Sequence, residues 1–313
     1  MTTPVPVLSV SDGSRTTVAD LVGAPMTIAA RILDVLANQF IADTLLRDAG
    51  RNTNGLVQYN RSTPLYLDDD VEAVAEFSEI PIGAGSRGLP MIAYAFKKGL
   101  GVRVSREMRD ENKLDDVNRQ ITQLRNTMVR AEDRALRALL TDPAIPTIVA
   151  SAAWTADGSK PRRDIALAQE RIASAKPDGG QGDDVFGFEA DTVVMPGNIT
   201  PILLDNEDFL KVYKDSAGGT SSIAYTGKLE RQVLGMDALK SRSWDRTRVL
   251  VCERKTVGFF SDTRPLEATP LYGEGGGPNG GPTESWRSDS TRKRAMGVDQ
   301  PLAACWITGV QAA

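Results

Sequence analysis

The sequence contains no histidine among its 313 residues. Histidine is the most frequent general base, the most frequent zinc ligand and the usual partner of a nucleophilic serine. Its absence argues against hydrolytic and metal-dependent chemistry. Enzymes without histidine exist, so this absence reduces the expectation of such chemistry and does not exclude an enzyme.

Cysteine is also scarce, and the chain has no net positive charge. Cys252 and Cys305 are the only cysteines, and each lies in an apolar, strand-like run, which predicts buried thiols in a reducing compartment. The formal net charge is −4, with no long basic block, so strong non-specific binding to nucleic acid is not expected. The longest apolar stretch contains Arg31 and Asp34, which argues against a membrane span. The first residues, MTTPVPVLSVSDG, lack the features of a signal peptide.

The longest periodic stretch of the chain runs from Asn112 to Thr141. Its apolar residues recur at steps of three and four, which places them on one side of a helix: Leu114, Val117, Ile121, Leu124, Met128, Ala131, Ala135 and Leu139. Asn112 can cap the start of the helix, with Asp115 three residues later as its partner in a capping box. Pro143 ends the helix. We expect the first five apolar residues, Leu114 to Met128, to face a sheet of the same chain. The alternative is a coiled coil, which the strand-rich remainder of the chain disfavours.

The region before this helix is predicted to have two parts. Residues 1–24 read as an extended arm, because Pro4, Pro6 and Gly13 interrupt any regular pattern. A helix is then predicted from Pro25 to about Asp48.

Strand signals dominate from Asn52 to Ser105, with β-leaning runs at 56–59, 72–80 and 91–96. Between the last two runs lies PIGAGSRGLP, whose Gly83, Gly85 and Gly88 have the G-x-G-x-x-G spacing of a dinucleotide-binding loop. That loop requires a helix after it, whereas a second strand-like run follows here. A long hairpin with a flexible tip at 80–90 is therefore the better prediction.

The region after the long helix alternates between strand and helix signals, with glycine-rich loops at 174–184, 216–222 and 273–282. One helix is predicted at Asp164–Ala173, and Glu284–Asp299 alternates weakly. Strands are predicted at Thr147–Ala153, Thr192–Met195, Arg248–Glu253, Thr256–Ser261 and Leu302–Val310. The mixture predicts a fold containing both helices and sheets.

Five segments carry a resemblance to a known family. They are AEFSEIP (75–81), AYAFKKGLGVRVSREMRDEN (93–112), ADTVVMPGNITPILLDNEDF (190–209), RTRVLVCERKTVGFFSD (246–262) and ESWRSDSTRKRAMGVDQPLAACWITG (284–309). With the long helix between the second and third, their order and spacing resemble the major capsid proteins of tailed bacteriophages, which have the Hong Kong 97-type fold.

The resemblance implies an α+β fold with four parts. An N-terminal arm and helix would occupy 1–54, and an extended β-hairpin loop would occupy 55–100. A peripheral domain built on the spine helix, 112–141, would occupy 101–147 and 246–313. An α/β axial domain would occupy 148–245.

The resemblance also implies a function: self-assembly through hexamers and pentamers into an icosahedral shell that encloses double-stranded DNA in the virion, after assembly in the bacterial cytoplasm. The expected partners are other copies of the chain, a separate scaffolding protein, a portal and packaged DNA held by weak non-specific contacts; the sequence leaves open a decoration protein and implies no membrane. The tip residues expected to contact a neighbouring subunit are Ile82, Gly83, Gly85, Arg87, Gly88 and Leu89. Because the tip has no lysine, covalent cross-linking of the kind some family members use is not expected. A shell subunit needs no catalytic, cofactor-binding or metal-binding residues, so the resemblance also implies that the chain is not an enzyme.

Two other classes of function stay open at this point. An encapsulin, the shell of a bacterial protein compartment, shares the fold and would enclose protein cargo. An α/β nucleotide-binding enzyme would need a phosphate-binding loop that leads into a helix, and neither of the two candidate stretches, 81–90 and 273–282, does so.

Overall fold

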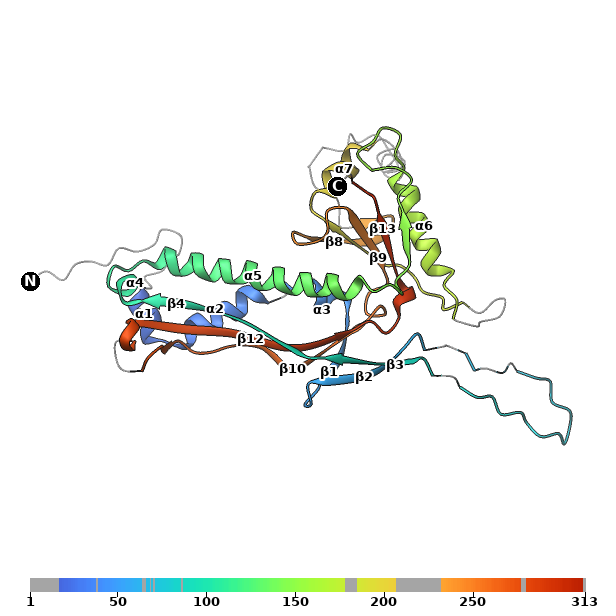
Figure 1. Ribbon diagram of the computed structural model, residues 1–313, viewed down its shortest axis with the longest axis horizontal. Helices are drawn as coiled ribbons and strands as arrows, with labels where there is room; N and C mark the ends of the chain where they lie inside the picture. The colour runs from blue at the N-terminus through green and yellow to red at the C-terminus, as the bar shows by residue number, and fades with distance from the viewer. Residues whose placement is uncertain are drawn as a thin grey trace, which may run out of the picture.

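In the part of the chain that the structure describes, one long helix joins two large sheets, and a two-stranded hairpin projects from one end of the molecule (Figure 1). The computed structural model describes residues 17–37, 39–63, 66–67, 69, 71–85, 87–177, 185–206, 232–276 and 280–311. The predicted loop residues 178–184, 216–222 and 277–279, and residues 1–16 of the predicted arm, lie outside these ranges.

The first sheet is long and narrow, and its central strand is β12 (Ser285–Gly297). One edge of β12 pairs with β10 (Phe259–Ala268) and β11 (Tyr272–Gly273). The other edge pairs antiparallel with β4 (Phe96–Ser105) over its whole length, from Ser285 opposite Ser105 to Arg294 opposite Phe96. A short helix, α4 (Arg106–Asp110), then turns the chain back toward the sheet.

The long predicted helix is present as α5 (Leu114–Leu140), which has 27 residues and is about 40 Å long at 1.5 Å per residue. It lies along β4 and β12 (Figure 1). The prediction that Asn112 caps this helix is wrong. Asn112 has a positive φ of 51°, and its Oδ1 accepts a hydrogen bond from the Val18 backbone N–H at 2.8 Å. It therefore satisfies a donor in the first turn of a different helix.

The buried face of α5 changes along its length. Leu114, Val117, Ile121, Leu124 and Met128 are all buried, in a cluster shared with the N-terminal helices and β4. Beyond Met128 the buried positions are Glu132, Asp133, Leu136 and Leu140, whereas Ala131 is exposed and Ala135 and Leu139 are only partly buried. A helix with 3.6 residues per turn drifts away from a strict 3.5-residue repeat. The last turns consequently face the core of the second sheet, which contains Leu136 and Leu140.

The N-terminal segment differs from the predicted arm and single helix. It forms α1 (Val18–Gly23), α2 (Met26–Leu36), α3 (Ile41–Leu45) and β1 (Arg47–Arg51), and β1 pairs parallel with β10. Thr17 and Asp20 form a capping box at the start of α1, and Val18 and Leu21 are buried. These contacts make residues 18–23 helical instead of extended. The helix predicted to reach Asp48 ends at Leu36, after which Ala37 turns to an extended conformation with ψ 133°.

The second sheet contains six strands in the order β5-β13-β9-β6-β8-β7. The strands are β5 (Thr147–Val149), β6 (Thr192–Pro196), β7 (Gln232–Val233), β8 (Met236–Ser241), β9 (Arg248–Cys252) and β13 (Ala304–Thr308). Helix α6 (Pro161–Ala173) packs against β13 and β9, and α7 (Ile199–Asp205) follows β6.

Residues 246–313, expected to belong together beside the spine helix, divide between the two sheets. β10 and β12 lie in the long sheet with α5, whereas β9 and β13 pair with β6 and β5 in the six-stranded sheet. Every residue of β6 is buried, which is typical of a strand with neighbours on both edges and cover on both faces.

Candidate assembly surfaces

The root of the projecting hairpin is fixed to the body of the molecule. β2 (Leu56–Arg61) and β3 (Leu89–Tyr94) pair antiparallel, from Leu56 opposite Tyr94 to Arg61 opposite Leu89. The ring of Tyr59 contacts the ring of Phe259 edge-on, with 4.9 Å between centroids. Arg61 Nη2 lies 2.7 Å from Asp142 Oδ1 in the loop after α5. These contacts set the direction in which the rest of the hairpin leaves the body.

The distal hairpin extends beyond these strands, and its end is at Ala75–Ser78. The Ser78 N–H donates to the Ala75 carbonyl at 3.0 Å, and Phe77 has a positive φ of 69°. The β2–β3 register explains the position: Arg61 is opposite Leu89, and Ala75 is halfway between them in the sequence. The predicted strand at 72–80 is not formed, and the end of the hairpin precedes the predicted position at 80–90.

The residues predicted at the tip lie instead on the limb that returns to the body. A Cβ added to Gly83 would meet the Leu67 side chain at 3.3 Å, and one added to Gly88 would lie 2.0 Å from the Arg61 carbonyl oxygen. Gly88 is therefore required for the close approach of the two limbs. Gly85 also faces Leu67, at 3.6 Å. Ile82 and Leu89 are 91% and 64% exposed, and Arg87 is exposed.

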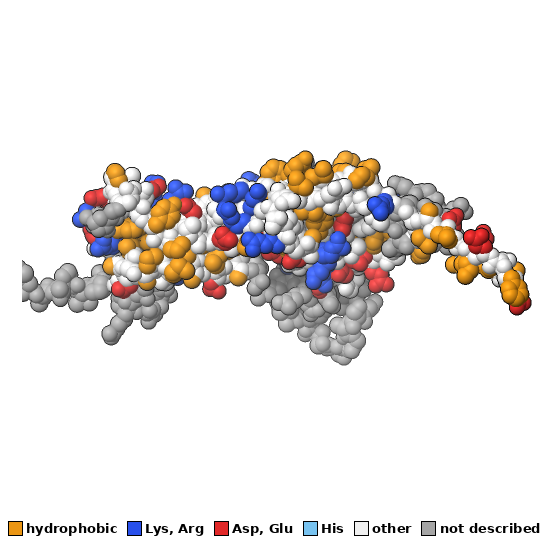
Figure 2. Space-filling view, turned by 90° about the horizontal axis from the view of Figure 1, so that it is seen from below, with side chains coloured by type: hydrophobic (Ala, Val, Ile, Leu, Met, Phe, Trp, Pro, Cys, Tyr) orange, Lys and Arg blue, Asp and Glu red, His pale blue; other side chains and the backbone are white. Residues whose placement is uncertain are grey.

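The distal hairpin presents apolar and acidic side chains together, as its projecting end in Figure 2 shows. Phe77 is 98% exposed and Ile80 is 75% exposed. Residues 62–86 contain no lysine or arginine, and their acidic residues are Asp68, Asp69, Asp70, Glu72, Glu76 and Glu79. Large apolar side chains left in water mark a surface that another molecule covers.

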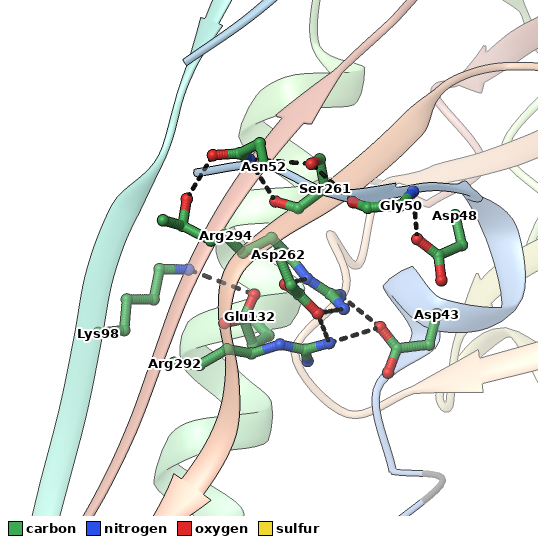
Figure 3. A network of polar contacts seen from close by, with 11 residues as sticks. Asp43, Asp48, Gly50, Asn52, Lys98, Glu132, Ser261, Asp262, Arg292 and Arg294 are labelled. Atoms are coloured by element: carbon green, nitrogen blue, oxygen red, sulfur yellow. Dashed lines mark hydrogen bonds and ion pairs between the residues drawn. The ribbon is translucent and has the colours of Figure 1, made fainter. Parts of the chain in front are cut away.

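A buried ion network fixes α3 to the long sheet (Figure 3). Arg294 of β12 donates from Nε to Asp262 of β10 at 2.7 Å and also pairs with Asp43 of α3. Arg292 contacts the same two carboxylates, at 3.1 and 3.3 Å. The guanidinium of Arg294 lies 3.8 Å from the centroid of the Phe260 ring. Burial raises the pKa of Asp262 above its usual value, and the hydrogen bond from Arg294 opposes that effect.

The arginines of this network have side chains only 7% and 3% exposed, so the network holds the fold together and is not a binding surface. Sequence reasoning did not identify it. The available signal was the alternation of Arg292 and Arg294 in a strand, which places both side chains on one face of a sheet.

Two adjacent buried carboxylates connect α5 to both sheets. Glu132 lies 3.5 Å from the Lys98 ammonium on β4, and Asp133 Oδ2 accepts a hydrogen bond from Ser241 Oγ on β8 at 2.6 Å. Burial raises the pKa of Asp133, and the nearby Glu132 carboxylate adds to this effect. The pair lies where the buried face of α5 passes from one core to the other.

The described residues offer few groups suited to catalysis or metal binding. Among them, no three or more histidine, cysteine, aspartate or glutamate side chains form a group that could hold a metal ion. Both cysteines are buried and unpaired, and burial raises the pKa of Cys305 to about 11, so the reactive thiolate is scarce at neutral pH. Within the same part of the chain, no helix is long and apolar enough to cross a membrane.

Comparison with solved structures gives the fold. The capsid of the cyanophage P-SCSP1u matches 87% of this chain and 89% of its own, with a TM-score of 0.60 and 13% identity. A Microbacterium phage Oxtober96 chain matches with a TM-score of 0.56 at 16% identity, over 83% of this chain and 88% of that one. The virus-like particle from Pyrococcus furiosus matches 90% of this chain and 97% of its own, with a TM-score of 0.56 and 11% identity. The predicted Hong Kong 97-type fold is confirmed.

Comparison of the sequence gives the family. No curated protein matches the chain. The family described as phage capsid protein matches residues 90–306, a range that begins in β3 and ends in β13 and so includes α5 and most strands of both sheets. The chain therefore belongs to the phage capsid protein family and is a structural component of a virion, not an enzyme.

Proposed function

We propose that the chain is the major capsid protein of a tailed phage, which self-assembles through hexamers and pentamers into an icosahedral shell around double-stranded DNA. The observation that best supports the proposal is the distal hairpin, which exposes Phe77 and Ile82 almost completely. A folded subunit gains nothing from leaving these side chains in water. A subunit that is surrounded by copies of itself can bury them.

The four-part division of the chain is part of this proposal. Residues 1–54 are the N-terminal arm and helices, and 55–100 are the extended loop. The peripheral domain comprises 101–147 with β10 and β12, and the axial domain comprises 148–245 with β9 and β13. The last assignment follows strand pairing, because β9 and β13 share a sheet with β5 and β6.

The proposed partners extend beyond other copies of the chain. A separate scaffolding protein directs assembly, a portal occupies one vertex, and packaged DNA makes only weak non-specific contacts with the shell. The mild negative charge of −4 supports the last point, because a shell that must release its genome cannot bind phosphates strongly. The proposed neighbour contacts of the hairpin include Ile82, Gly83, Gly85, Arg87, Gly88 and Leu89.

An encapsulin-type compartment is the second candidate, because the virus-like particle from Pyrococcus furiosus matches with a TM-score of 0.56 over 90% of the chain. The test is negative-stain electron microscopy of the expressed protein, together with nucleic-acid analysis of particles purified from infected or induced cells. We expect closed shells or capsomer rings, with DNA in the mature particles. Shells that carry protein cargo and no DNA would support the encapsulin, and compact monomers would contradict both candidates.

A further inference from the structure

One side of α5 is rich in arginine and has no accessible carboxylate along most of its length. From Val117 to the end of the helix at Leu140, the acidic residues are Glu132 and Asp133, which are 5% and 3% exposed. The same stretch contains five arginines, each exposed or half-buried: Arg119, Arg125, Arg130, Arg134 and Arg137. Because the whole chain has a net charge of −4, this concentration of positive charge is not a general property of its surface.

Four of these arginines lie on the side of α5 that faces away from the long sheet. With 3.6 residues per turn, they fall within about 60° of one another around the helix axis, roughly opposite the buried Val117, Ile121 and Met128. We call these four residues the arginine row: Arg119, Arg130, Arg134 and Arg137. α5 covers one face of the sheet (Figure 1), so the row points to solvent. It is about 27 Å long at 1.5 Å per residue.

A cleft of about 580 Å³ lies beside the arginine row, where α5 meets the end of β8 and the segment before α3. Four basic side chains line it: Arg125, Arg130, Lys240 and Arg242. Among its described lining residues, Asp133 is the one carboxylate. Asp133 accepts a hydrogen bond from Ser241 at 2.6 Å, and burial raises its pKa, which disfavours its negative charge. The cleft is therefore basic.

The cations of this cleft have no carboxylate partners within the subunit. Arg130, Lys240 and Arg242 are exposed, and none of them forms an ion pair with another described residue. Arg125 donates to the side-chain oxygen of its neighbour Asn126, at 3.1 Å, which leaves its charge uncompensated. The arginines of the buried network differ, because each contacts two carboxylates. Like charges held together repel one another, so an anion bound between them is stabilised.

A nucleic-acid backbone is the anion that matches the row and the cleft together. A row of about 27 Å is much longer than one small anion, whereas each strand of a DNA duplex places a phosphate about every 3.4 Å along the axis. Guanidinium groups bind phosphates through paired N–H donors, and Gln39 and Asn126 in the cleft supply neutral donors. We propose that the arginine row and the adjoining cleft bind the phosphate backbone of the packaged DNA without reading its sequence. This inference rests on the proposed function.

The proposed contact is local and depends on salt. Each phosphate that a protein neutralises contributes a slope of about −0.9 to the dependence of log affinity on log salt concentration. With about four phosphates per subunit, the affinity should fall roughly 100-fold between about 50 and 200 mM salt. The contact is therefore weak near physiological salt, as a shell that releases its genome requires. The net negative charge of the chain opposes binding elsewhere on its surface.

The test is a fluorescence anisotropy titration of a labelled DNA duplex of random sequence and about 30 base pairs, at salt concentrations from about 50 to 200 mM. The full chain is titrated as unassembled subunits or capsomers, because a closed shell would exclude the probe. The test variant combines Arg130→Gln with Arg242→Gln. The matched control combines Arg162→Gln with Arg163→Gln on α6, where both arginines are exposed and form no ion pair with another described residue. Both variants lose the same charge.

We expect the test variant to bind DNA at least fivefold more weakly than the wild type at low salt, with a salt slope smaller by about 1.8, which corresponds to two lost phosphate contacts. The α6 control should stay within about twofold of the wild type. Circular dichroism should show the same fold for all three proteins, because the substituted side chains are exposed.

Equal losses in the two variants would show that net charge alone governs binding, and the inference would be wrong. It would also be wrong if polyglutamate of matched charge bound the wild type as tightly as DNA does, because an acidic protein segment would then be the ligand. Electron microscopy of the same preparations tests the proposed function separately. Rings or shells without DNA binding contradict only the inference, whereas the absence of both rings and shells contradicts the proposed function.

Discussion

Strand β6 and the distal hairpin both carry large apolar side chains, but their surroundings are opposite. Val193 and Val194 of β6 are 0% exposed, whereas Phe77 and Ile82 of the hairpin are 98% and 91% exposed. β6 has β9 on one edge and β8 on the other, and the end of the hairpin has no neighbour among the described residues apart from its own second limb. The comparison shows that an apolar β-leaning segment is buried only where the fold supplies neighbours. Where it does not, we propose that another copy covers the segment.

The largest expected effect comes from placing the same charge in both kinds of region. Leu124→Asp puts an unpaired carboxylate among Leu114, Val117 and the other buried residues of its cluster, and should cost about 4 kcal/mol of unfolding free energy. Ile82→Asp, at a side chain that is 91% exposed, should leave the fold of the free subunit unchanged. Urea unfolding of both variants, followed by circular dichroism, measures the difference. A soluble, stable Leu124→Asp protein would contradict the buried position of this face.

The next effect concerns the buried ion network, which gives the long sheet a polar core. Arg294→Met leaves Asp262 and Asp43 with only Arg292 as a described cationic partner, and should cost about 3 kcal/mol, because removing one member of a buried pair leaves an uncompensated charge. Arg264→Met on the neighbouring strand β10 is the control, since Arg264 is exposed and its loss should change stability by less than about 0.5 kcal/mol. Equal unfolding midpoints for the two variants would show that the ion network does not contribute to the stability of the fold.

A smaller effect is expected from pH, at the contact between α5 and the six-stranded sheet. Burial raises the pKa of Asp133 in the folded chain, so the folded state holds this proton at pH values where the unfolded state has lost it. Stability from this group is therefore greatest at low pH and decreases as pH rises from the usual aspartate pKa to the raised one. Asp133→Asn keeps an oxygen for the Ser241 hydroxyl and should remove this part of the decrease. Thermal melts across that pH range measure how the melting temperature depends on pH. Parallel curves for the wild type and Asp133→Asn would contradict the prediction.

The smallest effect is expected at the hairpin itself. Arg87 is exposed, and we expect it to contact an acidic patch on a neighbour. Arg87→Glu should lower the melting temperature of assembled particles while leaving the circular dichroism of the free subunit unchanged. One exposed ion pair contributes only about 0–1 kcal/mol, but the contact is repeated at every subunit. If the particles of Arg87→Glu melted at the same temperature as those of the wild type, Arg87 would not contribute to the interface.

The sequence predicted best where one local rule decided the structure. The step of three and four residues located α5, and apolar runs located β6 and β9, because these elements bury whatever face is apolar. The capping box of Thr17 and Asp20 was also a local signal, and the two prolines and the glycine nearby obscured it.

The errors arose where a distant part of the chain decided the outcome. The end of the hairpin depends on the register that pairs Arg61 with Leu89, which no short window contains. The position of Asn112 depends on Val18, and the side chains of Arg292 and Arg294 depend on Asp43 of α3. The inter-subunit roles of Ile82, Arg87 and Leu89 depend on another molecule, so they stay predictions.

The continuity of α5 has a mechanical consequence. Its first turns are anchored in one core and its last turns in the other, and Glu132 and Asp133 attach its middle to β4 and β8. The two sheets therefore cannot tilt relative to each other without bending α5 or breaking the contacts of Glu132 with Lys98 and of Asp133 with Ser241. A subunit of this kind resists flexing internally. The different angles between neighbours that a closed surface demands must then be absorbed at the contacts between subunits and in their slender projections.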